Sequence, residues 1–330
     1  MKYLIEPRPM AASSIPRCSA TGDASTILIN EGYKPLYFPR LKSYGITGKI
    51  INYFQFISDC MRVYFTVKSE DIVFLQWPYT HRFIKLLHRV LKKKCNKLYI
   101  LIHDINSLRG GGQTAIEQDF MRTAYRIIVH SNEMKNFVKQ YGIPDNSFKI
   151  LTCFDYLTND EIKRPIRKTK EVVFVGQLDK SAFLDKVSQA NIGIHINLYG
   201  RYEKDMGDDV TYKCKFRADN VSVLEGSWGL VWNGDTIDEC TGAMGEYLRW
   251  NAPHKLSLFI VAHLPIIIWD KAAKAQYVRD KGIGICVASL KDIASRIDNI
   301  SDAEYRQMVE NIKIESERLR KGKNLIACLE

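Results

Sequence analysis

The first half of the chain alternates short apolar runs with segments whose apolar residues recur every three or four positions. The short runs predict strands at 2–5, 34–38, 71–75, 98–103 and 126–130. The segments between them predict helices over 20–31, 46–64 and 82–91. The run LYILIH (98–103) is almost wholly apolar, as expected of a strand covered on both faces. This alternation is typical of a parallel, doubly wound sheet.

A polar segment, TNDEIKRPIRKTK (158–170), then interrupts the pattern, and a second series of elements follows it. The second series predicts strands at 171–176, 192–200, 221–226, 229–232, 265–269 and 283–287. Ser301 and Glu304 have the spacing of a capping box and predict the start of a final helix. We therefore expect two α/β domains, 1–157 and 171–330, joined by the linker 158–170, with the last helix able to pack back on the first domain. Both domains are expected to be Rossmann-like and to face each other across a ligand cleft.

Composition supports a globular, two-domain protein, because 46% of the 330 residues are apolar and 26% are charged. The sequence opens without an apolar run of signal-peptide length, so we expect a cytoplasmic protein that can also work at the inner face of the membrane. The longest apolar stretch, 256–269, is broken by His263 and Pro265 and is too short to span a bilayer. None of the eight cysteines has zinc-like spacing, so we expect reduced thiols and no metal site.

The net charge of +11 suits partners that carry negative charge, namely polyanions, anionic lipid headgroups or diphosphates. The 37 acidic residues are interspersed with the 48 basic ones, which argues against a nucleic-acid partner. The segment FIKLLHRVLKKK (83–94) has two interpretations. It could press on an anionic membrane, or it could pack on the sheet and leave a solvated basic end.

The most informative segment is YLRWNAPHKLSLFIVAHLPIIIW (247–269), in which Pro253 suits the first turn of a helix. His254 and Lys255 then lie at the positive end of the helix dipole, where a cation is mildly unfavourable. That placement is explained if an anion docks there and is held by backbone N–H groups and the Lys255 ammonium. The alternative is that Lys255 is a solvated surface lysine.

A second candidate lies in VVFVGQLDKSAFL (172–184), where a buried strand ends at Gly176 and a helix follows. Glycine permits close approach of a ligand to the backbone, and Lys180 stands near the helix start. Lys180 and Lys255 together would form a pyrophosphate clamp. The alternative is an ordinary strand–glycine–helix junction.

Two further segments could serve an acceptor. His103 and Asp104 follow the most apolar strand, where a doubly wound fold presents functional side chains. Asp104 is the first choice for a general base and His103 the second, although Asp104 could equally cap a turn. Ser13 and Ser14 lie in a loop of small residues (7–23) that either admits substrate or merely connects.

The blocks GLVWNGD, YLRWNAPHKLSLFIVAHLPIIIW and VRDKGIGICVASLKDI resemble the carboxyl-terminal half of bacterial galactofuranosyltransferases from polysaccharide gene clusters. They are also similar to the glucosyltransferase that extends GlcNAc on streptococcal serine-rich adhesins. The resemblance continues in the same order through DIVFLQWPYT, LYILIHDINSL, IIVHSNEMKNFVKQYGI and VGQLDKSAFL.

This resemblance implies a metal-independent GT-B glycosyltransferase that uses no cofactor. It implies a UDP-sugar donor held mainly by the second domain and a glycan acceptor, oligosaccharide or lipid-linked, held mainly by the first. Carried over to this chain, the donor diphosphate would meet Lys180 and Lys255. The remaining candidates for the donor site are Gly176, Gln177, Tyr199, Asp235, His254 and Asp270.

The block 232–250 resembles the galactofuranosyl branch more closely, which favours UDP-galactofuranose as donor. The alternatives are a UDP-glucose-dependent enzyme that acts on a GlcNAc-modified glycoprotein and a non-catalytic partner that only binds a UDP-sugar. A nicotinamide-dependent enzyme lacks its glycine fingerprint after the first strand. Homo-oligomerisation is left open.

Overall fold

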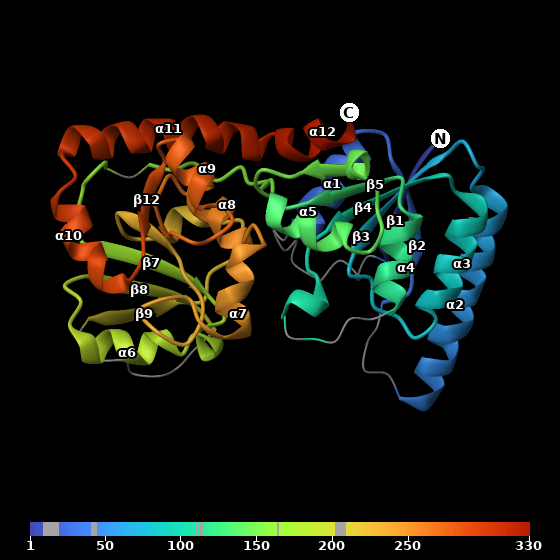
Figure 1. The fold of residues 1–330 in the computed structure, drawn as a ribbon, viewed down its shortest axis with the longest axis horizontal. Helices are drawn as coiled ribbons and strands as arrows, with labels where there is room; N and C mark the ends of the chain where they lie inside the picture. Colours follow the sequence, from blue (N-terminus) through green and yellow to red (C-terminus); the bar gives the residue numbers. More distant parts are fainter. Residues whose placement is uncertain (9–19, 41–44, 110, 112–114, 164, 202–208) are drawn as a thin grey trace. The chain divides into compact units, whose positions relative to one another are not determined.

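The computed structural model describes residues 1–8, 20–40, 45–109, 111, 115–163, 165–201 and 209–330. The chain forms two compact units that divide between Leu151 and Thr152, and the last residues, Cys328–Glu330, belong to the first unit. Each unit contains one six-stranded sheet in which all strands are parallel (Figure 1). The predicted α/β fold with two doubly wound sheets is confirmed. The described residues of the predicted linker, 158–170, form neither helix nor strand.

The sheet of the first unit has the strand order β2-β1-β3-β4-β5-β6. Its strands are β1 (Lys2–Pro7), β2 (Lys34–Phe38), β3 (Ile72–Trp77), β4 (Lys97–Ile102), β5 (Arg126–Val129) and β6 (Phe148–Ile150). Its helices are α1 (Ala20–Asn30), α2 (Ile46–Thr66), α3 (Ile84–Lys94), α4 (Ala115–Thr123) and α5 (Asn132–Lys139). Leu75 lies at the centre, in register with Ile5 on one side and Ile100 on the other, and all three are buried.

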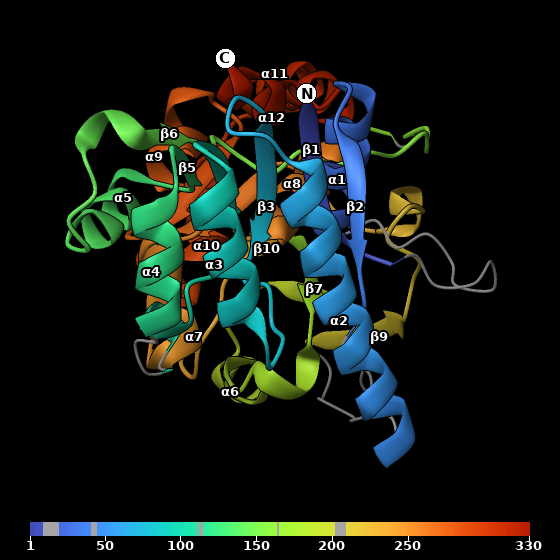
Figure 2. The ribbon, with the colours of Figure 1, turned by 90° about the vertical axis from the view of Figure 1, so that its right-hand side faces the viewer.

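Helices cover both faces of this sheet. Figure 2 shows α2, α3 and α4 side by side in front of the strands and α1 behind them. The buried residues of α2 include Phe56, Cys60 and Val63, which lie on one side of the helix. Ser131 is the N-cap of α5, because its hydroxyl accepts a hydrogen bond from the Met134 amide at 3.0 Å.

The sheet of the second unit has the order β12-β11-β10-β7-β8-β9. Its strands are β7 (Glu171–Gly176), β8 (His195–Gly200), β9 (Val210–Cys214), β10 (Trp228–Val231), β11 (Ile266–Trp269) and β12 (Gly284–Val287). Its longer helices are α6 (Phe183–Ala190), α8 (His254–Val261), α11 (Asp302–Arg320) and α12 (Lys323–Leu329). Its shorter helices are α7 (Gly242–Glu246), α9 (Ala275–Asp280) and α10 (Ile293–Asp298).

Close packing of α8 on the sheet fixes where its amino end lies. A Cβ on Gly229 of β10 would stand 2.3 Å from Cγ of Phe259, so only glycine allows α8 to approach this strand. On its other side α8 packs against α11.

The capping box predicted for Ser301 and Glu304 is present at the start of α11.

One strand prediction is wrong, and two strands, β6 and β9, were missed. Of residues 221–226, Val221–Val223 form a short 3₁₀ turn, and 224–226 belong to no strand. A short apolar run cannot by itself distinguish a buried strand from a buried turn. Both missed strands lie at a sheet edge, and only the first residue of each is buried, so neither shows an apolar run.

No helix among the described residues has both the length and the apolar character needed to cross a membrane.

Candidate functional site

The second sheet changes direction between its two central strands. From β7 the chain proceeds to β8 and β9 on one side, and later to β10, β11 and β12 on the other. The connections that leave β7 and β10 therefore diverge at the carboxyl edge of the sheet. Open parallel sheets bind their ligands at such a point.

Lys255 lies at this point. Its ammonium donates hydrogen bonds to the carbonyl of Trp232 at 3.0 Å and to Oδ1 of Asn233 at 2.9 Å, both directly after β10. It also lies 4.3 Å from the ring centre of Phe174 on β7. Three elements, β7, β10 and α8, thus hold a single ammonium at the predicted place.

Burial changes the chemistry of this ammonium. Desolvation lowers the pKa of Lys255 from 10.5 to about 7, while the nearby Cys240 opposes this shift. No ion pair with a carboxylate is formed by Lys255 within the described part of the chain. Near neutral pH its charge is therefore incompletely stabilised, and a bound diphosphate would favour the protonated form.

Binding of UDP should therefore take up a proton above neutral pH. At pH 8.5 the Lys255 amine is mostly neutral in the unliganded protein, whereas the phosphates of UDP are already ionised. We expect an uptake of about one proton per UDP, because the diphosphate raises the pKa of Lys255. The affinity for UDP should fall as the pH rises from 7 to 9.

Calorimetry in buffers of different ionisation enthalpy measures this uptake. Lys255→Arg is the matched control, because a guanidinium stays charged over this range and should show no uptake. An equal uptake by the wild type and the arginine variant would show that another group titrates.

The turn after β7 forms the neighbouring part of the same edge. Gly176 pairs with Gly200 of β8, and a Cβ on Gly200 would stand 2.2 Å from the Gly176 carbonyl oxygen. Gln177 and Lys180 follow, with exposed side chains, around a 3₁₀ turn in which the Lys180 amide bonds the Gln177 carbonyl at 3.1 Å. The amide of Phe183 contacts the carbonyl of Gly234 at 3.4 Å, so the β7 turn meets the loop after β10. Both predicted lysines therefore lie at one edge, after adjacent strands.

Several buried polar atoms at the end of β11 and around the start of α8 lack a hydrogen-bond partner among the described residues. They are Oδ1 of Asn251, Nε2 of His254, Nε1 of Trp269 and Oδ1 of Asp270. Trp269 and Asp270 end β11, and Asn251 and His254 lie at the start of α8. The amide of Ala273 donates to the Leu248 carbonyl at 2.8 Å, which joins the two segments. Each unpaired group costs about 1–3 kcal/mol, so this set suits a ligand that supplies hydroxyls.

His254 is held as a neutral ring. It stacks on Tyr156 with ring centres 4.9 Å apart and an interplanar angle of 19°. Desolvation lowers the pKa of His254 to about 4. At neutral pH it can therefore offer a hydrogen bond but no charge.

Two of the predicted donor residues are placed differently. Tyr199 is 1% exposed, and its hydroxyl donates to the Val223 carbonyl at 3.0 Å and accepts from the Glu225 amide at 2.9 Å. These bonds give Tyr199 a packing role, so we leave it out of the proposed site. Asp235 is exposed, and its carboxylate lies against Gly242. A Cβ added to Gly242 would stand 2.6 Å from Oδ2 of Asp235.

A pocket of about 450 Å³ lies at the opposite edge of the second sheet. Its lining includes Glu171 at the start of β7, Ser227 just before β10 and Leu264 just before β11. This pocket lies at the amino ends of the strands. It is therefore separate from the group formed by Lys255, Trp232, Asn233 and Phe174, which we call the Lys255 corner.

The first sheet changes direction between β1 and β3, and polar side chains meet at the carboxyl edge there. Gln76, near the end of β3, donates to Oε1 of Glu6 on β1 at 3.1 Å and to Ser25 of α1 at 2.8 Å. Its Oε1 lies 2.7 Å from Nε2 of His103, which follows β4. Since the amide nitrogen serves Glu6 and Ser25, the oxygen faces His103, and His103 carries its proton on Nε2. Nδ1 is then the nitrogen that can accept a proton.

Glu6 and Gln76 were not predicted from the sequence. Burial raises the pKa of Glu6, although its hydrogen bonds to Ser25 and Gln76 and the charge of Arg40 oppose that shift. The available signal was a single polar residue at the carboxyl end of each of two apolar strands, KYLIE and IVFLQ.

Asp104, the first choice for the base, forms an ion pair with Arg109 at 2.8 Å. Because this ion pair engages the carboxylate, we place His103 first in the proposed site and Asp104 second. Ser13 and Ser14 lie outside the described residues.

Comparison with known proteins identifies the family of the chain. The glucosyltransferase 3-like family matches with both of its domains, the N-terminal domain over residues 17–153 and the C-terminal domain over residues 172–330. Beta-1,6-galactofuranosyltransferase WbbI of Escherichia coli (strain K12) is 32% identical over 275 residues, which cover 80% of this chain and 79% of the relative. Glucosyltransferase 3 of Streptococcus parasanguinis is 24% identical over 264 residues, which cover 78% and 76%.

Among solved structures, sucrose-phosphate synthase from Thermosynechococcus elongatus aligns with a TM-score of 0.62 at 12% identity, covering 99% of this chain and 96% of that one. At this identity the likeness shows the fold alone. The resemblance seen in the sequence is confirmed by the family match. The chain belongs to the glucosyltransferase 3-like family and is a glycosyltransferase with the two-domain GT-B fold.

Proposed function

We propose that this glycosyltransferase transfers galactofuranose from UDP-galactofuranose to a glycan acceptor during synthesis of a cell-surface polysaccharide. The 32% identity to WbbI supports galactofuranose, because the glucosyltransferase 3 relative is only 24% identical over a similar length. The proposed acceptor is an oligosaccharide or a lipid-linked glycan, and the proposed place of action is the cytoplasm or the inner face of the membrane.

The observation that carries this proposal is the Lys255 corner. When the glycosidic bond of the donor breaks, negative charge develops on the departing UDP. An ammonium beside a helix amino end stabilises that charge without reorganising at the moment of reaction. Lys255 contributes the charge, and α8 contributes backbone N–H groups. Lys180, exposed after β7, is the second proposed cation.

The unpaired buried atoms beside this corner support recognition of the donor sugar. Nε1 of Trp269 and Oδ1 of Asp270 provide a donor and an acceptor at the end of β11. Sugar hydroxyls can satisfy both groups at once, since a hydroxyl donates and accepts. We propose that His254 and Asn251 complete the hydrogen bonds to the sugar.

In the first unit His103 is the proposed general base. It takes the proton from the acceptor hydroxyl as the new glycosidic bond forms, and Gln76 fixes the tautomer that presents Nδ1. Glu6 holds Gln76 in turn.

A donor comparison tests the function directly. The purified protein is incubated with UDP-galactofuranose, UDP-galactopyranose or UDP-glucose together with a GlcNAc-terminated or galactose-terminated acceptor, and UDP release and product mass are measured. We expect product from UDP-galactofuranose only. Product from UDP-glucose on the GlcNAc acceptor would instead favour the glucosyltransferase branch, and UDP binding without product from any donor would indicate a non-catalytic partner.

We also propose that transfer is independent of metal, because cationic side chains and a helix end can take over the stabilisation of the leaving diphosphate. Turnover in excess EDTA should stay within about twofold of the untreated rate. Loss of turnover in EDTA that manganese restores would show that a divalent ion takes part.

A further inference from the structure

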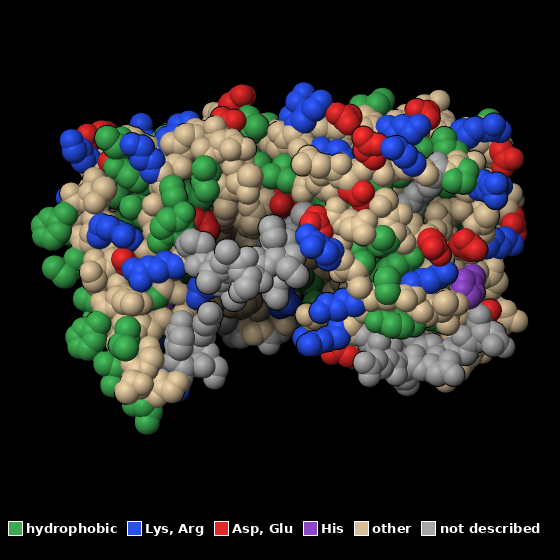
Figure 3. Space-filling model, turned by 180° about the vertical axis from the view of Figure 1, so that it is seen from behind, with side chains coloured by type: hydrophobic (Ala, Val, Ile, Leu, Met, Phe, Trp, Pro, Cys, Tyr) green, Lys and Arg blue, Asp and Glu red, His purple; other side chains and the backbone are tan. Residues whose placement is uncertain are grey.

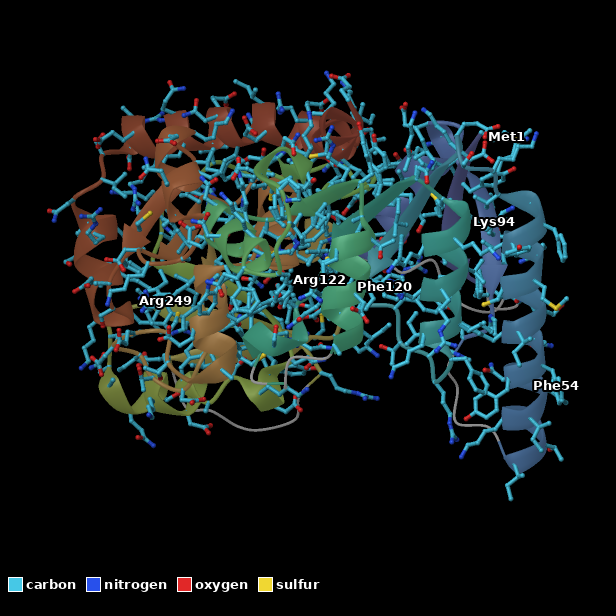
Figure 4. The ribbon with its side chains drawn as sticks, turned by 45° about the vertical axis from the view of Figure 1, so that its right-hand side comes forward. Met1, Phe54, Lys94, Phe120, Arg122 and Arg249 are labelled. Atoms are coloured by element: carbon cyan, nitrogen blue, oxygen red, sulfur yellow. The ribbon has the colours of Figure 1, made fainter. Side chains whose placement is uncertain are left out.

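Helix α2 carries an exposed apolar stripe. Its members follow helical spacing at intervals of four, four, three, four and four residues: Ile46, Ile50, Phe54, Ile57, Met61 and Phe65. Their exposed fractions range from 36% for Ile57 to 79% for Ile46, and Phe54 projects from α2 away from the sheet (Figure 4). Surface-exposed apolar residues are normal singly, but a contiguous row marks an interaction surface.

A row of cations accompanies the stripe on the neighbouring helix. Helix α3 packs against α2, and its exposed side chains are all basic: Lys85, Arg89, Lys92 and Lys93. The exposed Arg82 just before α3 extends this row. Lys93 and Lys94 lie 5.5 and 4.8 Å from the ring centre of Tyr64 of α2, and Arg82 lies 5.9 Å from that of Tyr53. In Figure 3, hydrophobic side chains gather along the side of the molecule formed by α2, with lysine and arginine near them.

Acidic side chains are almost absent from this surface. Between residues 45 and 68 and between 82 and 94 the sequence contains one acid, Asp59. Asp59 is buried and forms ion pairs with Arg8 at 2.8 Å and Arg62 at 3.1 Å. The exposed surface of the two helices is therefore apolar and positive.

An apolar stripe beside a row of cations favours an anionic membrane over a second copy of the chain as the partner of this surface. An anionic bilayer accepts apolar side chains below the headgroups and attracts cations beside them. A second copy of the chain that docked through the same stripe would bring two rows of like charge together, which is unfavourable. The stripe runs the length of a 21-residue helix, about 31 Å, which suits a helix lying in the plane of a membrane surface.

We propose that α2 and α3 form a docking surface for an anionic lipid membrane. The stripe of α2 enters the region between headgroups and acyl chains, and the basic row of α3 binds lipid phosphates. The inference does not depend on the identity of the donor sugar. In the enzyme, such docking would present the first unit to an acceptor carried by a lipid.

Flotation of the full chain with lipid vesicles tests the proposal. Vesicles of pure phosphatidylcholine are compared with vesicles containing about 30% phosphatidylglycerol, and the bound fraction is measured. We expect binding to the anionic vesicles only. Phe54→Gln/Phe65→Gln should lower the partition coefficient at least tenfold, because two exposed aromatic anchors are lost. Lys85→Gln/Lys92→Gln should lower it about tenfold or more.

Matched variants on the second unit provide the controls. Ile314→Gln removes an apolar side chain of α11 that is 65% exposed, and Lys186→Gln/Lys323→Gln removes the same charge as the α3 variant. Both should bind vesicles like the wild type. UDP affinity, measured in the same samples, should be unchanged in every variant, which separates failure of docking from failure of the donor site.

Three outcomes would overturn the proposal. One is wild-type binding to anionic vesicles no stronger than to neutral ones. Another is full binding by the Phe54/Phe65 variant. The third is a wild-type dimer in light scattering that this variant dissociates, with no vesicle binding, since the stripe would then belong to a second copy of the chain.

Discussion

Replacing His103 with alanine should lower the rate constant of sugar transfer by about 100- to 10,000-fold, the usual contribution of a general base. The imidazole receives its orientation from Gln76, whose Oε1 lies 2.7 Å from Nε2 of His103. UDP affinity should stay within about twofold, because His103 belongs to the first unit and the donor corner to the second. Single-turnover kinetics with saturating donor measures the first effect, and calorimetry with UDP measures the second.

Asp104→Asn is the matched comparison for His103. It removes the ion pair with Arg109 but leaves the His103–Gln76 contact in place, so we expect a loss of less than about tenfold. If Asp104→Asn were severely impaired and His103→Ala remained active, Asp104 and not His103 would be the general base.

Replacing Lys255 with methionine should weaken UDP binding by about 10- to 100-fold and lower kcat by about 100-fold or more. Methionine fills a similar volume beside Phe174 but provides no charge for the diphosphate. Affinity is measured by calorimetry and turnover by UDP release.

Two controls accompany the Lys255 variant. Lys255→Arg keeps the charge and should retain more activity than the methionine variant, and the melting temperature establishes that both variants are folded. The Lys255→Met substitution should not strongly destabilise the protein, because burial of the Lys255 ammonium in the absence of ligand is unfavourable. Equal UDP affinity in the wild type and Lys255→Met would remove the chemical basis of the donor site.

Much of this architecture could be predicted from the sequence, because strands covered on both faces are nearly continuous apolar runs. The position of Lys255 in the fold could be predicted for a related reason. Pro253 marks the start of α8, and the apolar run before it marks the end of β10, so Lys255 had to lie at the carboxyl edge of a sheet. The identity of its partners, Trp232 and Asn233, required the structure, because it depends on how the loop after β10 folds back.

Other parts could not be predicted from sequence alone. Glu6 and Gln76 are single polar residues in apolar strands, and only the register of β1, β3 and β4 brings them to His103. The segment 46–64 was correctly predicted as a helix, but its apolar residues surround much of its circumference. Which of them face the core and which face solvent depends on how α2 packs on its sheet, so the exposed stripe appeared only in the structure.

A crystal structure of the protein with UDP tests the central claim most directly. The account predicts phosphate oxygens within hydrogen-bond distance of Nζ of Lys255 and of the first backbone amides of α8, with the uridine beside the turn that follows β7. Diphosphate bound in the pocket at the amino ends of the strands, or anywhere that leaves Lys255 on Trp232 and Asn233 alone, would contradict it.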